Sequence, residues 1–330
     1  MERVVRSEVS QSGAKFLSIF FILLTSRYVL GQRLPDTIDK LRPAIIQIKQ
    51  ECTFGNAVMS SSGTGFLVNR DGFALTAAHV VDCPANAVIQ GSNSPQPLTA
   101  QRSLVGIPVV HVTTDQTHTR RNFTYVQAEI IESDHIHDVA LLKISRNPFK
   151  NIIDSGYTLN GKKLALERLG IAMLGARKPR EGEAIAISGY PVLRDSNQPV
   201  FDTNAGIVAS IHSSRDRDLP TYFNSATDQL QARVTFDLYE ADMRVNPGNS
   251  GGPVYNSLTG EVIGVCSAFR PTSVKEQDPT NDQWKDSSLG YNSGLAIVIP
   301  IAYGTILMSQ HAVNAPQQRK KILVHAQGKP

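Results

Sequence analysis

Short apolar runs separated by turn-forming residues fill the chain from about residue 44 to residue 300. The runs are rich in β-branched residues, Gly, Pro, Asn and Asp stand between them, and the 3.6-residue period of a long helix is scarce. The runs that qualify as strands fall into two groups: residues 44–49, 63–68, 73–76, 109–114, 125–132 and 139–144, then residues 184–189, 204–210, 235–239, 253–255, 262–269 and 294–300. Two groups of about six strands predict an all-β protein built from two six-stranded antiparallel β-barrels.

The segment between the two groups is expected to carry the chain from one barrel to the other. Residues 147–180 hold several Gly, Lys and Arg residues. The prediction is an N-terminal barrel at residues 32–160, the crossover and C-terminal barrel at 161–305, and a tail at 306–330, with a short closing helix at 301–308. Polar stretches at residues 91–102, 115–122, 212–231 and 271–291 predict long surface loops, which more often carry function than short connections do.

The first 31 residues have the layout of a signal peptide. Arg3, Arg6 and Lys15 precede an apolar run at residues 16–24, and small residues follow near Gly31. The apolar run is shorter than the roughly 20 residues that cross a bilayer, and Arg27 interrupts any extension of it. We therefore expect cleavage after residue 31, export to the periplasm or the medium, and no stable membrane insertion; a retained anchor is the alternative.

Composition and charge suit a globular protein without a nucleic-acid partner. The chain has 330 residues, of which 41% are hydrophobic and 19% charged. Its formal net charge is +4, and residues of both signs are intermixed along the sequence. A nucleic-acid surface would show a basic block or stripe, so charge excludes this class of partner.

Cys52, Cys83 and Cys266 permit one disulfide in an exported chain. Cys52 ends the first apolar run, and Cys83 follows a histidine segment that is expected to pack near that run, so this pair is the preferred disulfide. Two free buried thiols are the alternative. Cys266 lies inside an apolar strand, which indicates a buried, inert thiol.

A glycine-dense turn around Ser250 is the strongest chemical signal in the chain. The residues Asn-Pro-Gly-Asn-Ser-Gly-Gly-Pro occupy positions 246–253, between apolar strands. A nucleophilic serine needs an exposed hydroxyl and nearby backbone N–H groups for the oxyanion, and flanking glycines allow the sharp turn that provides both. Gly248 and Ser250 are the candidate N–H donors. An ordinary turn is the alternative interpretation of this stretch alone.

A base and a carboxylate for such a serine are found in two other apolar contexts. His79 follows an apolar strand and stands among small residues that leave room for its ring, and Asp138 opens the apolar run at residues 139–144. Taken singly, His79 fits a core histidine and Asp138 a turn residue at a strand start. His135 and His137 lie beside Asp138 without a third ligand at a suitable spacing, so we interpret them as loop residues and predict no metal site.

Together these contexts resemble the trypsin-like serine peptidases, most closely the exported HtrA/Deg family. The similarity lies in Gly-Thr-Gly-Phe-Leu-Val at 63–68, Thr-Ala-Ala-His at 76–79, Asp-Val-Ala-Leu-Leu at 138–142, Asn-Ala-Gly-Ile-Val at 204–208 and the serine turn. It implies two barrels with the active site between them and a triad of His79, Asp138 and Ser250. The oxyanion hole would be the N–H groups of Gly248 and Ser250, and no metal or organic cofactor would be required.

The resemblance also suggests how substrate binds and where this chain departs from the family. Ser267 and the backbone after it resemble the strand that pairs with an extended peptide. Arg244 and Phe269 fall where related enzymes shape the specificity pocket. Phe269 is expected to narrow it, which predicts a small or medium apolar preference. Arg244 is a candidate to attract an acidic side chain; the alternative is that it points to solvent or pairs with Asp242 or Glu240. Asn249 replaces an aspartate of the digestive members, which argues against activation by a newly cut N-terminus. About thirty residues follow residue 300, so a PDZ domain is not expected.

The predicted function is an exported serine endopeptidase acting on unfolded or flexible polypeptides. The alternative from another class is a non-catalytic protein that binds polypeptides on a protease fold, because a fold does not determine activity. The sequence does not determine the oligomeric state, and an oligomer is possible.

Overall fold

The computed structural model describes residues 33–89, 94–109, 122–191, 200–213, 223–224, 229–230, 236–272, 275–277, 284–286 and 291–315. The predicted signal peptide and most of the predicted tail lie outside these residues. Within the described ranges, no helix combines the length and the apolar character that a bilayer crossing requires.

The first barrel consists of six antiparallel strands that close on themselves. Neighbouring strands pair in the order β1, β2, β3, β7, β6, β5, and β5 pairs back to β1. The short β4 (Asn86–Ala87) pairs with the outer edge of β5. The barrel strands are β1 (Ile45–Phe54), β2 (Ala57–Leu67), β3 (Phe73–Thr76), β5 (Gln96–Val109), β6 (Asn122–Asp134) and β7 (Val139–Ile144).

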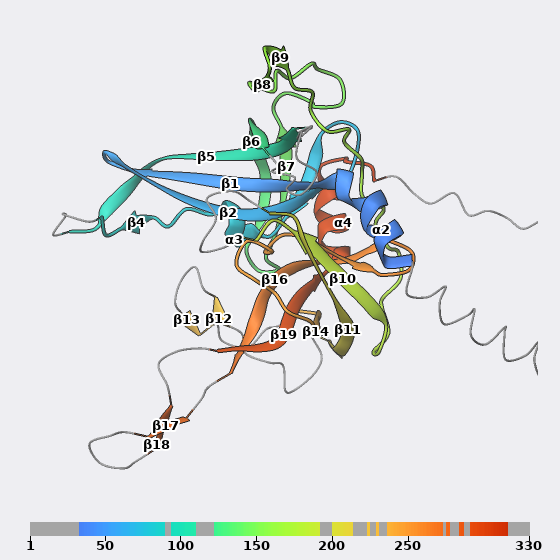
Figure 1. The fold of residues 1–330 in the computed structure, drawn as a ribbon. Coiled ribbons are helices and arrows are strands. Elements are labelled where there is room, and N and C mark those ends of the chain that lie inside the picture. The colour runs from blue at the N-terminus through green and yellow to red at the C-terminus, as the bar shows by residue number, and fades with distance from the viewer. Residues whose placement is uncertain are drawn as a thin grey trace, which may run out of the picture.

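The second barrel is also six-stranded and closed, with neighbours in the order β10, β11, β14, β19, β16, β15. Its strands are β10 (Ala184–Gly189), β11 (Asp202–His212), β14 (Leu238–Asp242), β15 (Pro253–Asn256), β16 (Val262–Thr272) and β19 (Tyr291–Pro300). The two barrels lie against each other in Figure 1. The predicted all-β architecture of two six-stranded barrels is therefore confirmed.

Short helices and hairpins complete the described structure. The helical elements are α2 (Arg33–Leu41), η1 (Arg42–Ala44), α3 (Ala78–Val81) and α4 (Ile301–Gln310), and the hairpins are β8 (Thr158–Leu159) with β9 (Lys162–Lys163), β12 (Phe223–Asn224) with β13 (Gln229–Leu230), and β17 (Lys275–Gln277) with β18 (Trp284–Asp286). Helix α4 continues beyond the domain boundary expected at residue 305, because Leu307 and Met308 are buried in the core.

The loop predicted at residues 91–102 is wrong from Gln96 onward, where β5 begins. Most residues in the first half of β5 are exposed. This half therefore lacks the alternation of apolar and polar residues that identifies a half-buried strand. The strand predicted at 109–114 shares only Val109 with β5, which ends there; residues 110–121 lie outside the described part.

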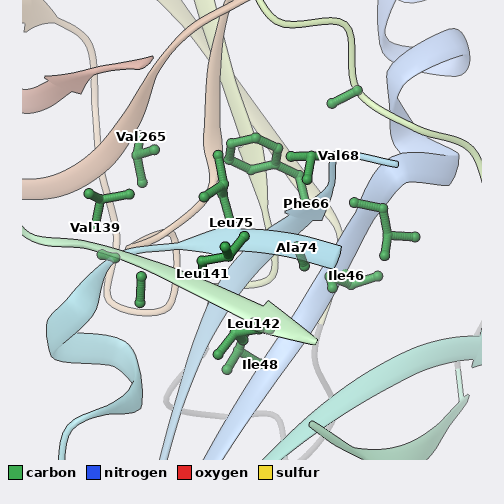
Figure 2. Packing of buried hydrophobic residues seen from close by; sticks show 14 of the residues in the cluster. Ile46, Ile48, Phe66, Val68, Ala74, Leu75, Val139, Leu141, Leu142 and Val265 are labelled. Carbon is green, nitrogen blue, oxygen red and sulfur yellow. The ribbon is translucent and has the colours of Figure 1, made fainter. Parts of the chain in front are cut away.

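One hydrophobic core runs through the first barrel and across to the second. Figure 2 shows Ile46, Leu75 and Leu141 of the first barrel with Val265 of β16 in the same cluster of buried residues. A second cluster, containing Ile187 and Val254, fills the interior of the second barrel. Because apolar packing continues from one barrel to the other, their relative position is fixed, and with it the distance between groups that the two barrels contribute to a common site.

Candidate active site

His79 lies at the start of a single helical turn directly after β3. Ala77 and Ala78 beside it are buried, and the small side chains leave space for the imidazole ring. Its Nδ1 lies 3.0 Å from Oδ1 and 2.9 Å from Oδ2 of Asp138. An ionised carboxylate only accepts hydrogen bonds, so Nδ1 carries the proton and Nε2 is left as an acceptor.

Asp138 is held rigidly at the start of β7. Its backbone has a φ of 50°, a left-handed conformation that is uncommon outside glycine, and the residue is 8% exposed. The His79 backbone N–H donates to Oδ1 at 3.0 Å, and the Ser267 hydroxyl donates to Oδ2 at 2.5 Å. Donors from both barrels therefore fix this carboxylate in place.

The pairing shifts the pKa of both groups toward their charged forms. Burial lowers the pKa of His79, but the charge of Asp138 and the hydrogen bond to it together raise the pKa above its ordinary value of 6.5. Burial raises the pKa of Asp138. The charge of His79 and the hydrogen bonds from His79 and Ser267 lower this pKa by a larger amount, so the net shift is downward. Asp138 is thus ionised at neutral pH and stabilises a protonated His79.

The turn at Ser250 is built from backbone hydrogen bonds. Asn249 N–H donates to Asn246 O at 3.0 Å, Gly252 N–H to Asn249 O at 2.9 Å, and Gly251 N–H to Cys266 O at 2.7 Å. Gly248 and Gly251 have φ of 95° and 81°, which side chains strongly disfavour. Within the described structure, the N–H groups of Gly248 and Ser250 donate to no protein acceptor. An oxyanion requires N–H donors of this kind, and these two have no acceptor among the described residues.

The Ser250 hydroxyl donates to the backbone oxygen of Ser267 at 3.1 Å. No hydrogen bond joins this hydroxyl to His79 in the described part of the chain. The same residue, Ser267, thus contacts two of the three candidate catalytic residues, with its hydroxyl on Asp138 and its carbonyl on Ser250.

Thr64 of β2 is a site residue that sequence reasoning missed. Its hydroxyl donates to Gly248 O at 2.7 Å and accepts from Tyr190 N–H at 2.9 Å, while its N–H donates to Ser250 O at 2.8 Å. Its carbonyl accepts from the Thr76 hydroxyl at 2.7 Å. The first barrel thereby holds the serine turn of the second. The sequence signal was the position of this threonine between two glycines, but three of its partners, Tyr190, Gly248 and Ser250, lie more than a hundred residues away along the chain.

The residues predicted to bind substrate lie along β16 and before the serine turn. Ser267 is 2% exposed, Phe269 is half-buried on β16, and Arg244 is exposed. Glu240, an alternative partner for Arg244, instead pairs with Arg270 at 2.9 Å and with His212 at 3.2 Å. Arg244 makes no ion pair with any described residue.

Asn249 lies within the serine turn, whereas the three cysteines lie on β1, after α3 and on β16. Asn249 is 1% exposed, and its side-chain oxygen has no donor among the described residues. Cys52 and Cys83 form a disulfide that joins β1 to the segment after His79. Cys266 is buried, and burial together with the charge of Asp138 raises the pKa of its thiol, so this thiol is unreactive.

His135 and His137 each have a carboxylate partner of their own. His135 pairs with Asp82 at 3.0 Å and His137 with Asp134 at 2.6 Å. In the described residues, no group of three or more His, Cys, Asp or Glu side chains is arranged to hold a metal ion.

Comparison with known proteins identifies the family. The model of the trypsin-like peptidase domain matches residues 63–265. A probable periplasmic serine endoprotease, DegP-like, of Marinomonas sp. (strain MWYL1) is 27% identical over 208 residues, which are 63% of this chain and 30% of that protein. Serine protease HTRA1 of Xenopus tropicalis is 27% identical over 235 residues, 70% of this chain and 37% of that protein.

The chain therefore spans about a third of the length of these curated relatives. Among solved structures, the serine endoprotease from Yersinia pestis is 17% identical with a TM-score of 0.45, and the alignment covers 84% of this chain and 65% of that one. Since the family model covers more than half of the sequence, this chain belongs to the trypsin-like peptidase domain family.

Proposed function

We propose that the chain is an exported serine endopeptidase that hydrolyses peptide bonds in unfolded or flexible polypeptides. The observation that carries the proposal is the His79–Asp138 pair at 2.9 Å, lying with Ser250 around one shared neighbour, Ser267. The imidazole is oriented by a buried carboxylate, and the serine stands in a turn with two free N–H donors. Relatives named as a probable serine endoprotease and a serine protease support the same activity.

In the proposed reaction, Ser250 Oγ attacks the substrate carbonyl carbon and His79 Nε2 takes the hydroxyl proton. Asp138 stabilises the imidazolium that forms, and the N–H groups of Gly248 and Ser250 bind the oxyanion. When the C–N bond breaks, His79 gives its proton to the leaving amine. Water then attacks the acyl-enzyme, with His79 again as the base, and restores Ser250. These steps require no metal or organic cofactor.

Ser250 must exchange its hydrogen-bond acceptor before it can attack. Its hydroxyl rests on Ser267 O and has to turn toward His79 Nε2. A neutral hydrogen bond contributes about 0.5–1.5 kcal/mol net, so rotation of one side chain is a small barrier beside the chemical step. The resting arrangement is therefore compatible with a competent enzyme.

Substrate is proposed to bind in extended form on β16, from Ser267 onward. Phe269 would narrow the pocket for the side chain before the scissile bond and favour small or medium apolar residues. Arg244, exposed and free of described ion pairs, is available to attract an acidic residue nearby. A peptide-library profile in which Lys or Arg dominates that position would contradict this pocket.

The test of the function compares the mature chain with Ser250→Ala and measures casein cleavage and labelling by a fluorophosphonate. We expect cleavage and stoichiometric labelling of the parent chain and loss of both in the variant. Cleavage that persists in Ser250→Ala would remove the serine from its role. A parent chain that suppresses aggregation of unfolded proteins but is neither labelled nor active would support the non-catalytic binding function.

Export is proposed from the layout of residues 1–31, and relatives named as periplasmic agree with it. N-terminal sequencing of the protein recovered outside the cytoplasm is expected to begin near residue 32. A sequence that begins upstream of residue 16 would favour a retained anchor.

A further inference from the structure

The turn that carries Asp138 is closed by a single carboxylate. Asp134, the last residue of β6, pairs with Val139 of β7, so the residues between them form the turn. Asp134 Oδ1 accepts the backbone N–H of Ile136 at 3.0 Å and that of His137 at 3.1 Å. Its Oδ2 lies 2.6 Å from Nδ1 of His137. The residue directly before Asp138 is therefore held through both its backbone and its side chain.

The ring of His137 lies against two aromatic rings from the C-terminal half of the chain. It stacks on Tyr303 of α4, with the ring centroids 3.9 Å apart and an angle of 20° between the planes. Phe236, shortly before β14, meets the His137 ring edge-on at 5.2 Å and contacts Tyr303 at 6.1 Å. Stacked and edge-to-face arrangements are the favoured contacts of aromatic rings. These three rings, the aromatic clamp, join the turn of the first barrel to two elements of the C-terminal half.

The two partner rings of the clamp are themselves held in place. The Tyr303 hydroxyl accepts the backbone N–H of Asp237 at 3.0 Å, and the Asp237 carboxylate pairs with Lys178 at 3.0 Å. Phe236 is buried in the core, and α4 packs against β7 of the first barrel and β16 of the second. Because packed interiors are stiff, rings fixed in this way restrict the position of the ring between them.

Helix α4 also contacts the strand that leads to His79. A Cβ at Gly304, the residue after Tyr303, would lie 2.8 Å from Leu75 Cδ1, so the helix and β3 are in close contact at this point. One helix thus touches both the strand before His79 and the turn before Asp138. It thereby fixes the relative position of the two residues whose side chains meet at 2.9 Å.

The backbone of Asp138 requires support of this kind. Its φ of 50° is a conformation that residues other than glycine keep only where the surrounding structure imposes it. The hydrogen bonds from His79 and Ser267 act on the side chain of Asp138, and the pairing of β7 with β6 begins only at Val139. His137 constrains the peptide that joins it to Asp138 from the other side.

We propose that His137 is a positioning residue for the triad, because the aromatic clamp holds the turn in the conformation that directs the carboxylate of Asp138 at Nδ1 of His79. The proposal rests on the proposed peptidase function and adds to it a residue that neither transfers a proton nor binds substrate. The ring contacts carry the role, and the basicity of the imidazole does not. A benzene ring should therefore replace His137, whereas a smaller side chain that keeps an N–H donor toward Asp134 should not.

The test compares three variants at position 137 by steady-state cleavage of a short peptide. His137→Phe keeps the ring, His137→Asn keeps a donor toward Asp134, and His137→Ala removes both. Titration with a fluorophosphonate counts the competent sites, so unfolded protein does not lower the measured kcat. Because misplacing a catalytic group by about 1 Å can cost about a hundredfold, we expect kcat to fall roughly tenfold to a hundredfold in His137→Ala and His137→Asn. It should stay within about threefold in His137→Phe, with KM little changed in all three.

Ile136→Ala is the matched control from the same turn. The Ile136 side chain is 68% exposed, and alanine keeps the backbone N–H that Asp134 accepts. This variant should cleave with the kcat of the parent chain.

The acid limb of the kcat/KM profile is a readout that a loss of stability alone does not move. Burial lowers the pKa of His79, whereas the charge of Asp138 and the hydrogen bond to it raise this pKa. A carboxylate that is poorly directed raises it less, so the limb should move to lower pH in His137→Ala and stay in place in His137→Phe. Asp82, whose charge also raises the pKa of His79, is unchanged in every variant. Tyr303→Leu removes the partner ring and should reproduce the shift, and its combination with His137→Ala should shift the limb no further than either change alone.

The outcomes separate the clamp from the proposed function. If His137→Ala is less stable but keeps the kcat per titrated site and the acid limb of the parent chain, His137 is only structural and the proposal fails, while the peptidase function stands. Rescue by His137→Asn and not by His137→Phe would assign the effect to the bond with Asp134 and overturn the clamp. A parent chain that is neither labelled nor active would remove the proposed function. The proton resonance of His79 Nδ1–H, which reports its hydrogen bond to Asp138, would then decide on the clamp, since it should be lost in His137→Ala and kept in His137→Phe.

Discussion

Thr64→Val tests how the first barrel holds the serine turn of the second. Valine keeps the size and β-branching of threonine and removes only the hydroxyl. In the parent chain this hydroxyl donates to Gly248 O at 2.7 Å and accepts from Tyr190 N–H at 2.9 Å, and Thr64 is fully buried. The substitution therefore leaves a backbone carbonyl and a backbone N–H without this partner in a site that water does not reach.

The expected magnitude follows from these two groups. A buried polar group that loses its partner costs about 1–3 kcal/mol, so the free energy of unfolding should fall by roughly 2–6 kcal/mol. Release of Gly248 O also frees the peptide next to one of the two proposed oxyanion donors. Loss of one such donor costs about a hundred- to a thousandfold in kcat, so a tenfold to thousandfold decrease is expected, with KM little changed.

Urea denaturation measures the first effect, and steady-state cleavage of a short peptide measures the second. Thr64→Ser is the control, because it retains the hydroxyl and removes only a methyl group; we expect it to keep kcat within about tenfold and to lose on the order of 1 kcal/mol of stability. If Thr64→Val unfolds within about 0.5 kcal/mol of the parent chain and cleaves at the same rate, the hydroxyl does not hold the turn.

Further predictions concern the dyad, the disulfide and the turn. The raised pKa of His79 places the acid limb of the kcat/KM profile above pH 6.5, and Asp138→Asn should shift the limb downward and lower kcat about ten-thousandfold. The same shift stabilises the fold below the unfolded pKa of His79, and this contribution is lost as pH rises through the folded pKa, which pH-dependent urea unfolding of the parent and Asp138→Asn would detect. Replacing Cys52 and Cys83 by Ala releases a loop with a separation of 31 residues and should lower the free energy of unfolding by about 3.7 kcal/mol; a loss below about 1 kcal/mol would contradict the loop-entropy argument. Gly251→Ala places a Cβ 2.1 Å from Thr76 Oγ1 at a φ of +81°, so fluorophosphonate labelling should disappear, and normal labelling would refute the tight packing of this turn.

The strands that could be predicted from sequence are those with the simplest surroundings. Strands β3, β7 and β10 begin and end where their apolar runs do, because each run is buried nearly throughout. A strand that is buried on both faces is a nearly continuous run of apolar residues, and such a run can be recognised in the sequence. The first halves of β2 and β5 could not be predicted, because they are exposed and lack a regular alternation of apolar and polar residues.

The candidate site shows a similar limit. The local contexts of His79, Asp138 and Ser250 suggested their chemistry, but only resemblance to a family joined them. No local pattern encodes the contact of His79 with Asp138, 59 positions apart, or the connection of Asp138 to Ser250 through Ser267. Thr64 illustrates the same point, because its hydroxyl bonds Gly248 O across a separation of 184 residues. Propensity and pattern describe neighbours along the chain, whereas these bonds depend on how two barrels pack.

Strand β2 connects the stability of the protein with its proposed chemistry. Phe66 and Leu67 at its C-terminal end are fully buried in the core, Thr64 bonds the serine turn, and Ser60 in its first half is exposed. A shift of β2 by one residue would exchange its two faces, remove Phe66 from the core and turn Thr64 away from Gly248 at once. The same register that buries the core therefore also holds the turn that carries Ser250. Conditions that loosen the packing between the barrels should abolish fluorophosphonate labelling before the individual barrels unfold, because Ser250 is held in position by a residue of the other barrel.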